Sequence, residues 1–132
     1  MNENNYDSIN SFEKENWWYR AKRDLIGLLI SNLGKNFDYA LDLGCGVGSN
    51  YEILKKRAKK IVGIDFSQKA INYCLKKGYY SLKKMDATKM EFKAETFDLV
   101  IASDVLEHLE DNKAVSEVKR ILKKQGIFIF SV

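Results

Sequence analysis

The sequence predicts an α/β fold in which a doubly wound, mainly parallel sheet of five strands carries helices on both faces. Short apolar runs alternate along the chain with segments whose apolar residues recur at helical spacing. The runs are apolar along most of their length, which is typical of strands buried on both faces of a parallel sheet. The 132 residues, 45% hydrophobic and 30% charged, are enough for one globular domain. Together these observations indicate a Rossmann-like arrangement.

Each element follows from a local pattern. The expected strands span residues 39–43, 61–65, 79–83, 97–102 and 127–132. The expected helices span residues 17–33 and 67–77, a segment through Tyr51, Leu54 and Ala58, and a segment through Val115, Val118 and Leu122 that ends at Gly126. Ser67 is expected to cap its helix, because a serine hydroxyl accepts from the first free backbone N–H groups. Residues 1–16 are polar and predict an N-terminal arm or short helix ahead of a core at 17–132.

The composition narrows the class of protein. No apolar run approaches the roughly 18 residues of a membrane-spanning helix, and the N-terminus lacks the basic start and apolar segment of a signal peptide. Cys45 and Cys74 lie far apart in the sequence, which favours the cytoplasm over an oxidising compartment and argues against a zinc site. The formal net charge of +4 is compatible with an anionic ligand.

A glycine cluster follows the first expected strand directly. Gly44, Gly46 and Gly48 allow a tight turn and leave the backbone open to a ligand, and the next helix directs free N–H groups to the same place. Asp42 ends the strand beside this loop, and its carboxylate favours a cationic ligand over a pyrophosphate. Ser49 stands where a dinucleotide fingerprint has Gly or Ala. From this cluster alone, the alternative remains that the glycines only form a tight turn and bind no ligand.

A second acidic residue ends the second expected strand. A carboxylate at Asp65 can accept two hydrogen bonds from a ribose diol. Its alternative role as a helix cap is better filled by Ser67. The strand, glycine loop, helix, strand and acid, in this order, therefore indicate a ligand that contains a ribose.

Four stretches, at residues 41–48, 62–67, 85–87 and 97–109, extend this pattern. With them the sequence resembles the class I S-adenosylmethionine-dependent methyltransferases over about residues 38–132, above all the type 11 group with its ubiquinone- and menaquinone-type enzymes. The resemblance implies S-adenosylmethionine as cofactor, S-adenosylhomocysteine as product, and a small molecule that accepts the methyl group on oxygen, nitrogen or carbon. Such a displacement requires no catalytic nucleophile, because the cofactor supplies the reactivity.

The resemblance also implies roles for individual residues. The loop would lie under the methionine and ribose, with Asp42 near the amino group, Asp65 on both ribose hydroxyls and Asp86 on the adenine amino group. The cofactor-binding residues implied in this way are Asp42, Gly44, Cys45, Gly46, Gly48, Asp65, Phe66, Asp86, Ala87 and Ser103. Asp86 and Ser103 also fall at expected strand ends, although Asp86 has the alternative role of a turn residue.

An aromatic and basic segment at residues 17–23 precedes the first strand. Similar helices in this family cover the cofactor pocket. The ring of Trp18 would suit a sulfonium cation, and Arg20 or Arg23 would pair with the methionine carboxylate. A helix that packs Trp17 and Trp18 on the sheet is the structural alternative, and both can hold.

The single histidine, His108, has three possible roles. Asp104, Glu107 and His108 would share one face if the stretch is helical, which is the spacing of a metal site, although relatives have Glu where Asp104 stands. His108 would otherwise be a general base for a hydroxyl acceptor or a structural residue.

Three other functions remain open at this stage. The chain could be a cofactor-binding module without turnover, an RNA methyltransferase that uses the basic run at 55–60, or a nicotinamide-dependent oxidoreductase. Ser49 and Asp42 disfavour the last. The absence of proline excludes the proline-containing loops of exocyclic-amine and cytosine-C5 methyltransferases.

The resemblance finally implies a sheet of seven strands, of which the last two would form a hairpin after residues 127–132. We therefore expect that a C-terminal segment is missing or that a second copy of the chain, as a homodimer, covers the edge strand.

Overall fold

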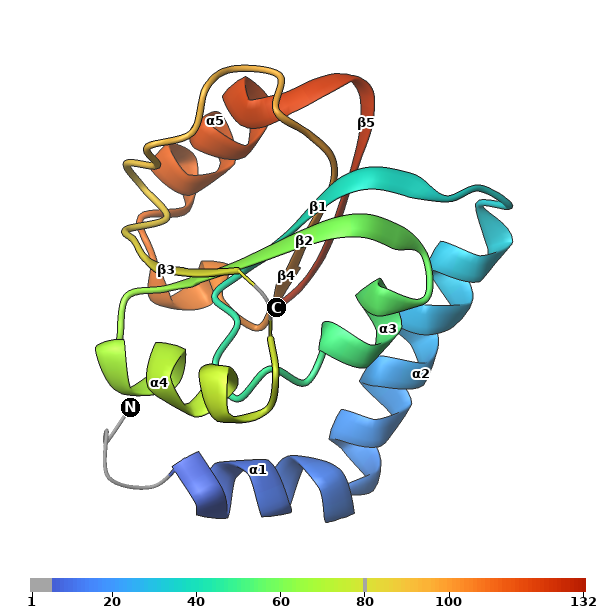
Figure 1. The fold of residues 1–132 in the computed structure, drawn as a ribbon, viewed down its shortest axis with the longest axis vertical. Coiled ribbons are helices and arrows are strands. Elements are labelled where there is room, and N and C mark those ends of the chain that lie inside the picture. Colours follow the sequence, from blue (N-terminus) through green and yellow to red (C-terminus); the bar gives the residue numbers. More distant parts are fainter. Residues whose placement is uncertain (1–5, 80) are drawn as a thin grey trace.

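A computed structural model describes residues 6–79 and 81–132 of the chain (Figure 1). The strands are β1 (Phe37–Leu43), β2 (Ala58–Asp65), β3 (Leu82–Lys84), β4 (Phe97–Ser103) and β5 (Leu122–Ser131). The helices are α1 (Tyr6–Glu15), α2 (Trp17–Asn32), α3 (Tyr51–Lys55), α4 (Gln68–Lys76), the short 3-10 helix η1 (Leu106–His108) and α5 (Asp111–Ile121). No helix of these described ranges is long and apolar enough to cross a membrane.

The five strands form one parallel sheet in the order β3-β2-β1-β4-β5. From β1 the chain moves outward to β3 on one side, and then from β4 to β5 on the other side. The strand order therefore reverses between β1 and β4, where the loops that leave the carboxyl ends of the two strands diverge. This confirms the predicted doubly wound arrangement and places a ligand crevice at that edge.

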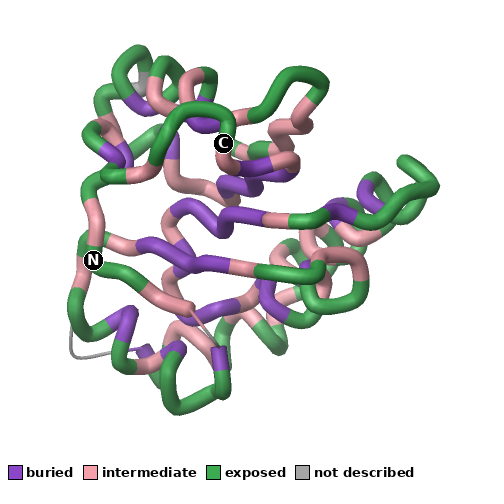
Figure 2. The backbone as a smooth tube through the Cα atoms, turned by 45° about the horizontal axis from the view of Figure 1, so that its top comes forward, coloured by how far each residue is buried: buried purple, intermediate pink, exposed green. Residues whose placement is uncertain are grey.

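Helices cover both faces of this sheet, and Figure 2 shows that the buried stretches gather in its strands. α2 and α3 bury their apolar sides on one face, and α5 buries its apolar side on the other. The first core contains Ile26, Ile30, Phe37, Ala40, Leu54, Leu99 and Ile101. The second contains Leu41, Leu43, Val62, Ile64, Ala87, Met90, Phe97, Val100, Ala102, Val118 and Ile121. Ala40 and Leu41 belong to different cores because successive strand residues point to opposite faces.

The N-terminal residues form a helix rather than a loose arm. α1 is held on the body by Tyr6, which packs with Val47 and Ala70 and donates a 3.0 Å hydrogen bond to the Ser67 hydroxyl. Asn16 begins α2, because its side-chain oxygen accepts from the backbone N–H of Trp18 at 2.9 Å. Residues 1–5 lie outside the described residues.

Several expected boundaries differ. Ala58 was expected in the helix that carries Tyr51 and Leu54, but α3 ends at Lys55, and Ala58 begins β2, where it pairs with Phe37. The second strand therefore starts three residues before the expected 61–65.

The third strand was expected at 79–83 and spans Leu82–Lys84, while Tyr80 lies outside the described residues. The preceding helix ends in a Schellman motif, in which the N–H of Gly78 donates to the Leu75 carbonyl and that of Tyr79 to the Cys74 carbonyl. Tyr79 is therefore used in ending α4 and does not begin the strand.

The last helix ends at Ile121 and does not reach Gly126. Leu122 already pairs with Phe97, and Ile127 pairs with Leu99, so residues 123–126 form a bulge within β5. A Cβ at Gly126 would lie 2.8 Å from the Leu122 side chain. The glycine thus serves the tight bulge and not the end of a helix.

Candidate active site at the carboxyl ends of β1, β2 and β4

A cavity of about 1170 Å³ opens at the carboxyl ends of β1, β2 and β4, beneath α1 and α2. Nine of the residues expected from the sequence line it, namely Gly44, Cys45, Gly46, Asp65, Phe66, Asp86, Ala87, Ser103 and His108. Arg20, Trp18, Asp42 and Gly48 are not among its lining residues. Nine of the predicted residues thus come together in one cavity, whereas Arg20, Trp18, Asp42 and Gly48 lie outside its lining.

The glycine loop between β1 and α3 forms the floor of the cavity. Gly44, Gly46 and Gly48 have φ angles of 70°, 52° and 79°, which L side chains rarely adopt. A Cβ at Gly44 would lie 2.4 Å from Cγ2 of Val105, the residue that follows β4 closely. α3 begins only at Tyr51, so turn residues separate the loop from the helix that was expected to follow it directly.

Asp65 lies at the end of β2 with both carboxylate oxygens oriented by the backbone. Its Oδ2 accepts from the Gly46 N–H at 3.0 Å, and its Oδ1 accepts from the Ser67 N–H at 2.9 Å. The hydroxyl of Ser67 accepts from the Ala70 N–H, which confirms Ser67 as the cap of α4. A carboxylate oxygen accepts more than one hydrogen bond, so the fixed carboxylate can still bind a diol.

Asp86 and Ala87 follow β3 on the same side of the cavity. Oδ1 of Asp86 accepts from the backbone N–H of Thr88 at 2.8 Å and from its hydroxyl at 2.7 Å. These two bonds hold the pKa of Asp86 below its usual value. The turn role expected as an alternative is therefore real, and it fixes the carboxylate at the cavity wall. Phe66, which is 74% exposed, lines the cavity as well.

Asp42 is fully buried beneath the glycine loop, and does not face the cavity. Its Oδ2 accepts a 2.6 Å hydrogen bond from the Tyr79 hydroxyl, and its Oδ1 accepts from Nδ2 of Asn50 at 3.3 Å. Burial raises the pKa of Asp42 to about 6, although the bonds from Tyr79 and Asn50 oppose the rise. In this geometry Asp42 has no direct access to a cofactor in the cavity, so the predicted contact with the amino group does not form.

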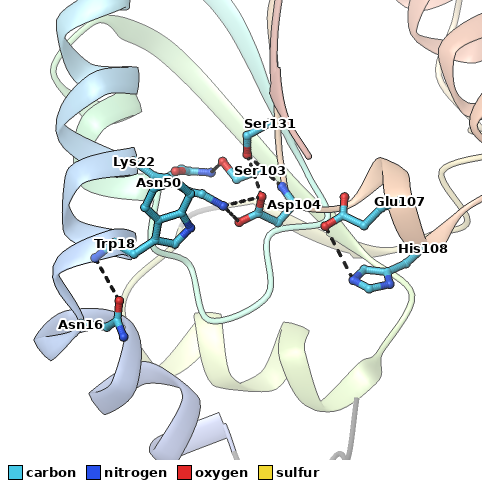
Figure 3. A network of polar contacts seen from close by, with 9 residues as sticks. All are labelled: Asn16, Trp18, Lys22, Asn50, Ser103, Asp104, Glu107, His108 and Ser131. Atoms are coloured by element: carbon cyan, nitrogen blue, oxygen red, sulfur yellow. Dashed lines mark hydrogen bonds and ion pairs between the residues drawn. The ribbon is translucent and has the colours of Figure 1, made fainter.

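Asn50 links the ends of two neighbouring strands. Besides Asp42 at the end of β1, its Nδ2 contacts Oγ of Ser103 at the end of β4, 3.1 Å away (Figure 3). Asn50 is buried and lines the cavity. Sequence patterns did not single it out, because its partners lie in other segments of the chain.

α2 is joined to the opposite wall of the cavity by an ion pair. Nζ of Lys22 lies 2.8 Å from both carboxylate oxygens of Asp104, which also accepts from the Ser131 hydroxyl at 3.0 Å (Figure 3). This pair closes one side of the cavity between α2, β4 and β5. Asp104 has a φ of 54°, so it does not continue into η1.

The structure places the residues of the aromatic and basic segment 17–23 differently from the prediction. Trp17 and Trp18 are 73% and 52% exposed, so the expectation that both pack on the sheet is wrong. Arg20 is exposed and lies outside the cavity, whereas Arg23 lines it and donates to the Glu13 carbonyl at 2.9 Å. The cavity face of α2 is Tyr19, Lys22, Arg23 and Ile26. The helical spacing from the buried Ile26 is the signal that separates Arg23 from Arg20.

His108 lies at the rim of the cavity with its side chain 75% exposed. Its Nε2 is 3.8 Å from Oε1 of Glu107, which lies beside it in η1 (Figure 3). The helical face expected for Asp104, Glu107 and His108 does not form, because Asp104 turns away to pair with Lys22. Within residues 6–79 and 81–132, no group of three such side chains is arranged to hold a metal ion.

Comparison with known proteins agrees with this geometry. Residues 41–130 match the model of a family described as a methyltransferase domain. The chain therefore belongs to this family, and its Rossmann-like sheet is the fold of S-adenosylmethionine-dependent methyltransferases.

Individual relatives have diverse names. An uncharacterized protein of Methanocaldococcus jannaschii is 36% identical over 110 residues, which are 81% of this chain and 46% of that protein. A ubiquinone biosynthesis O-methyltransferase of Bartonella quintana is 30% identical over 69% of this chain and 39% of its own length. A sterol 24-C-methyltransferase of Candida albicans is 35% identical over 74% of this chain and 28% of its own length. The chain thus spans less than half the length of the curated relatives it matches.

Among solved structures, the N-methyltransferase NodS of Bradyrhizobium japonicum in complex with S-adenosylhomocysteine superimposes with a TM-score of 0.78. The match covers 96% of this chain and 72% of that one, at 24% identity. At this identity the likeness shows a shared fold.

Proposed function

We propose that the chain is the cofactor-binding core of an S-adenosylmethionine-dependent methyltransferase that acts on an oxygen, nitrogen or carbon atom of a small molecule. The observation that carries the proposal is the carboxylate of Asp65. Two backbone N–H groups orient it at the cavity wall, beside a loop whose glycines leave the backbone open. That combination suits a ligand whose ribose diol meets Asp65 and whose cationic part lies over the loop, above the negative charge of Asp42.

The residues present fit this cofactor. Gly44 has a positive φ, and a Cβ there would collide with the Val105 side chain. The position therefore accepts only glycine, which leaves no side chain between the loop backbone and the cofactor. Asp65 would bind the ribose hydroxyls, and Asp86 with the Ala87 backbone would bind the adenine edge. The exposed ring of Phe66 would lie against the base. When bound, the cofactor supplies a methyl group on a positively charged sulfur.

The methionine end of the cofactor would meet α2 and the end of β4. Arg23 replaces Arg20 as the partner of the carboxylate, because Arg23 lines the cavity. Asp42 would act at a distance, through the loop, by adding negative charge below a cationic ligand. Its neighbours Asn50 and Ser103 would fix the loop and the strand end that the methionine touches.

The chain's contribution to the reaction is alignment and exclusion of water. The ion pair of Lys22 with Asp104 holds α2 over the cavity, so that an acceptor enters beside η1. Alignment of two reactants can contribute about 7–11 kcal/mol. For an acceptor with a hydroxyl or amine, His108 at the rim would take the proton, with Glu107 beside it to orient the ring. The two buried free thiols suit a reducing compartment such as the cytoplasm.

Isothermal calorimetry with S-adenosylmethionine, S-adenosylhomocysteine and NAD tests the proposal. We expect both sulfur compounds to bind and NAD not to. Asp65→Ala should weaken binding of S-adenosylhomocysteine by roughly tenfold to a hundredfold, since it loses hydrogen bonds to a charged acceptor. Binding of NAD alone would overturn the proposal.

The matched control is Asp98→Ala. Asp98 accepts from the backbone N–H groups of Asp38 and Tyr39 at the other end of the sheet, so its carboxylate has the same kind of partners as Asp65. We expect it to lower stability without changing the affinity. Release of S-adenosylhomocysteine against a panel of phenols, amines and carbon acceptors then separates an enzyme from a binding module.

A further inference from the structure

The two cysteines, distant in sequence, meet directly under the glycine loop. Their Sγ atoms lie 3.9 Å apart, and both residues are buried and free. Cys45 belongs to the loop and lines the cavity, whereas Cys74 lies in α4 and is fully buried. The thiol of Cys74 contacts the carbonyl oxygen of Gly46 at 3.2 Å.

The distance between the thiols is short enough to be bridged. A disulfide places its sulfur atoms about 2.05 Å apart, so the two must approach by about 2 Å. Cys45 lies in the glycine loop, outside any helix or strand, while Cys74 is fixed in α4 among Tyr51, Ile71 and Tyr79. The approach of the two sulfur atoms therefore requires the loop to move toward the helix, against the hydrogen bonds that hold its backbone to Ile64 and Asp65.

We propose that Cys45 and Cys74 are a modification site, at which a peroxide forms a reversible disulfide that withdraws the glycine loop from the cofactor. Hydrogen peroxide is small enough to enter the cavity and reach Cys45. The effect on the cofactor rests on the proposed function, whereas the formation of the disulfide does not.

The chemistry balances in two steps. The thiolate of Cys45 attacks one peroxide oxygen and breaks the O–O bond, which gives a sulfenic acid and, after protonation, one water. The thiolate of Cys74 then attacks the sulfenic sulfur, the S–S bond forms, and the leaving hydroxide takes a proton to give a second water. Two thiols together lose two electrons and two protons, and one peroxide becomes two waters.

The environment makes this reaction slow at neutral pH. The neighbouring Cys74 and burial raise the pKa of Cys45, so little thiolate is present. The rate is therefore expected to rise with pH, and the pair responds to sustained rather than brief exposure to the oxidant.

The disulfide has a direct consequence for the loop. It removes the Cys74 contact with Gly46 and draws Cys45 toward α4, so the 3.0 Å bond from the Gly46 N–H to Asp65 is strained or lost. A cofactor that needs Asp65 in place then binds more weakly. Conversely, a ligand in the cavity covers Cys45 and protects it.

The experiment treats the full chain with hydrogen peroxide at pH 8, with and without S-adenosylhomocysteine. Intact mass and peptide mapping should find a Cys45–Cys74 link, formed more slowly when the ligand is present. Calorimetry should show affinity for S-adenosylhomocysteine reduced by roughly tenfold or more after oxidation, and restored by dithiothreitol. Cys45→Ser and Cys74→Ser, which cannot form the link, are the controls, with Cys45→Ala and Cys74→Ala beside them in case serine disturbs folding.

Each further outcome has a defined meaning. Oxidation without a link between the two peptides overturns the modification site. A link that leaves the affinity unchanged overturns its effect on the cofactor. If the reduced chain does not bind S-adenosylhomocysteine at all, the proposed function fails, while peptide mapping still decides whether the disulfide forms.

Discussion

The hydroxyl of Tyr79 donates a 2.6 Å hydrogen bond to the buried carboxylate of Asp42, and so joins the end of α4 to the end of β1. Burial raises the pKa of Asp42 to about 6, although its hydrogen bonds from Tyr79 and Asn50 oppose the rise. The strand end that carries the glycine loop is therefore sensitive to the charge of one side chain. This relationship leads to a prediction on pH.

Asp42→Asn should change how stability depends on pH. The pKa of Asp42 rises from 3.8 to about 6 on folding, so the folded chain binds the proton more tightly. Its contribution to the free energy of unfolding is then greatest below about pH 4 and is lost as pH rises through 6. The change corresponds to at most about 3 kcal/mol. The side-chain amide of the variant stays neutral at every pH. The free energy of unfolding of the variant should therefore rise relative to that of the parent as pH increases from 4 to above 6.

Urea denaturation of both proteins between pH 4 and pH 8 measures the difference. In the variant, the Asn50 amide must turn so that its oxygen faces the new side-chain amide, which Ser103 permits because its hydroxyl can donate as well as accept. A difference that is the same at every pH would contradict the raised pKa.

Gly44→Ala should destabilise the chain much more than Gly34→Ala. Both glycines have a positive φ, 70° and 65°, so both substitutions incur about 1–2 kcal/mol of backbone strain. A Cβ at Gly34 meets nothing within 4 Å, whereas one at Gly44 lies 2.4 Å from Val105. The overlap should bring the total for Gly44→Ala to about 2–5 kcal/mol.

Denaturation midpoints of four proteins test this assignment. Val105→Ala removes the nearest methyl groups, so Gly44→Ala combined with Val105→Ala should cost less than the sum of the two single changes. Simple additivity would mean that the Gly44 backbone, rather than its contact with Val105, sets the cost.

The ion pair between Lys22 and Asp104 should have a measurable coupling energy. Its side chains are only 22% and 26% exposed, and its atoms are 2.8 Å apart. A double-mutant cycle with Lys22→Met and Asp104→Asn should give about 1–2 kcal/mol. The pair of Lys59 with Asp38 is 78% and 70% exposed at 3.6 Å, and a cycle there should give about 0–0.5 kcal/mol. Equal coupling in the two cycles would exclude a special role for the buried pair.

His108→Gln should lower turnover and leave cofactor binding unchanged. If His108 removes a proton from a hydroxyl or amine acceptor, its loss should reduce kcat by about 10²–10⁴. Its exposed position at the rim predicts no change in the affinity for S-adenosylhomocysteine. Lys113→Gln, on the exposed side of α5, serves as the control for both measurements. A variant with full turnover would assign His108 a structural role.

Sequence patterns were sufficient where the information is local. The strands at 39–43 and 97–102, the positive-φ glycines of the loop, the cap at Ser67 and the position of Asp65 at a strand end are set by neighbours within a few residues, and the structure contains each of them.

The remaining features depend on contacts between distant segments. The hydrogen bond of Tyr79 to Asp42, which ties the end of α4 to the end of β1, spans 37 residues and could not be read from the sequence. The pairing of Lys22 with Asp104 spans 82 residues, and it is this contact that separates Asp104 from Glu107 and His108. Gly126 looked like a helix terminator because the bulge opposite Phe97 and Leu99 exists only in the assembled sheet.

The position of β1 at the centre of the sheet sets an order for assembly during synthesis. β1 is translated first among the strands, yet its second neighbour, β4, ends only at Ser103. Until then, one side of β1 has open hydrogen-bonding groups, and the buried faces of Ala40 and Leu41 lack their partners Leu99 and Val100. While β4 is still being synthesised, β1 therefore has one unpaired edge, and an unpaired strand edge is a template for pairing with another chain.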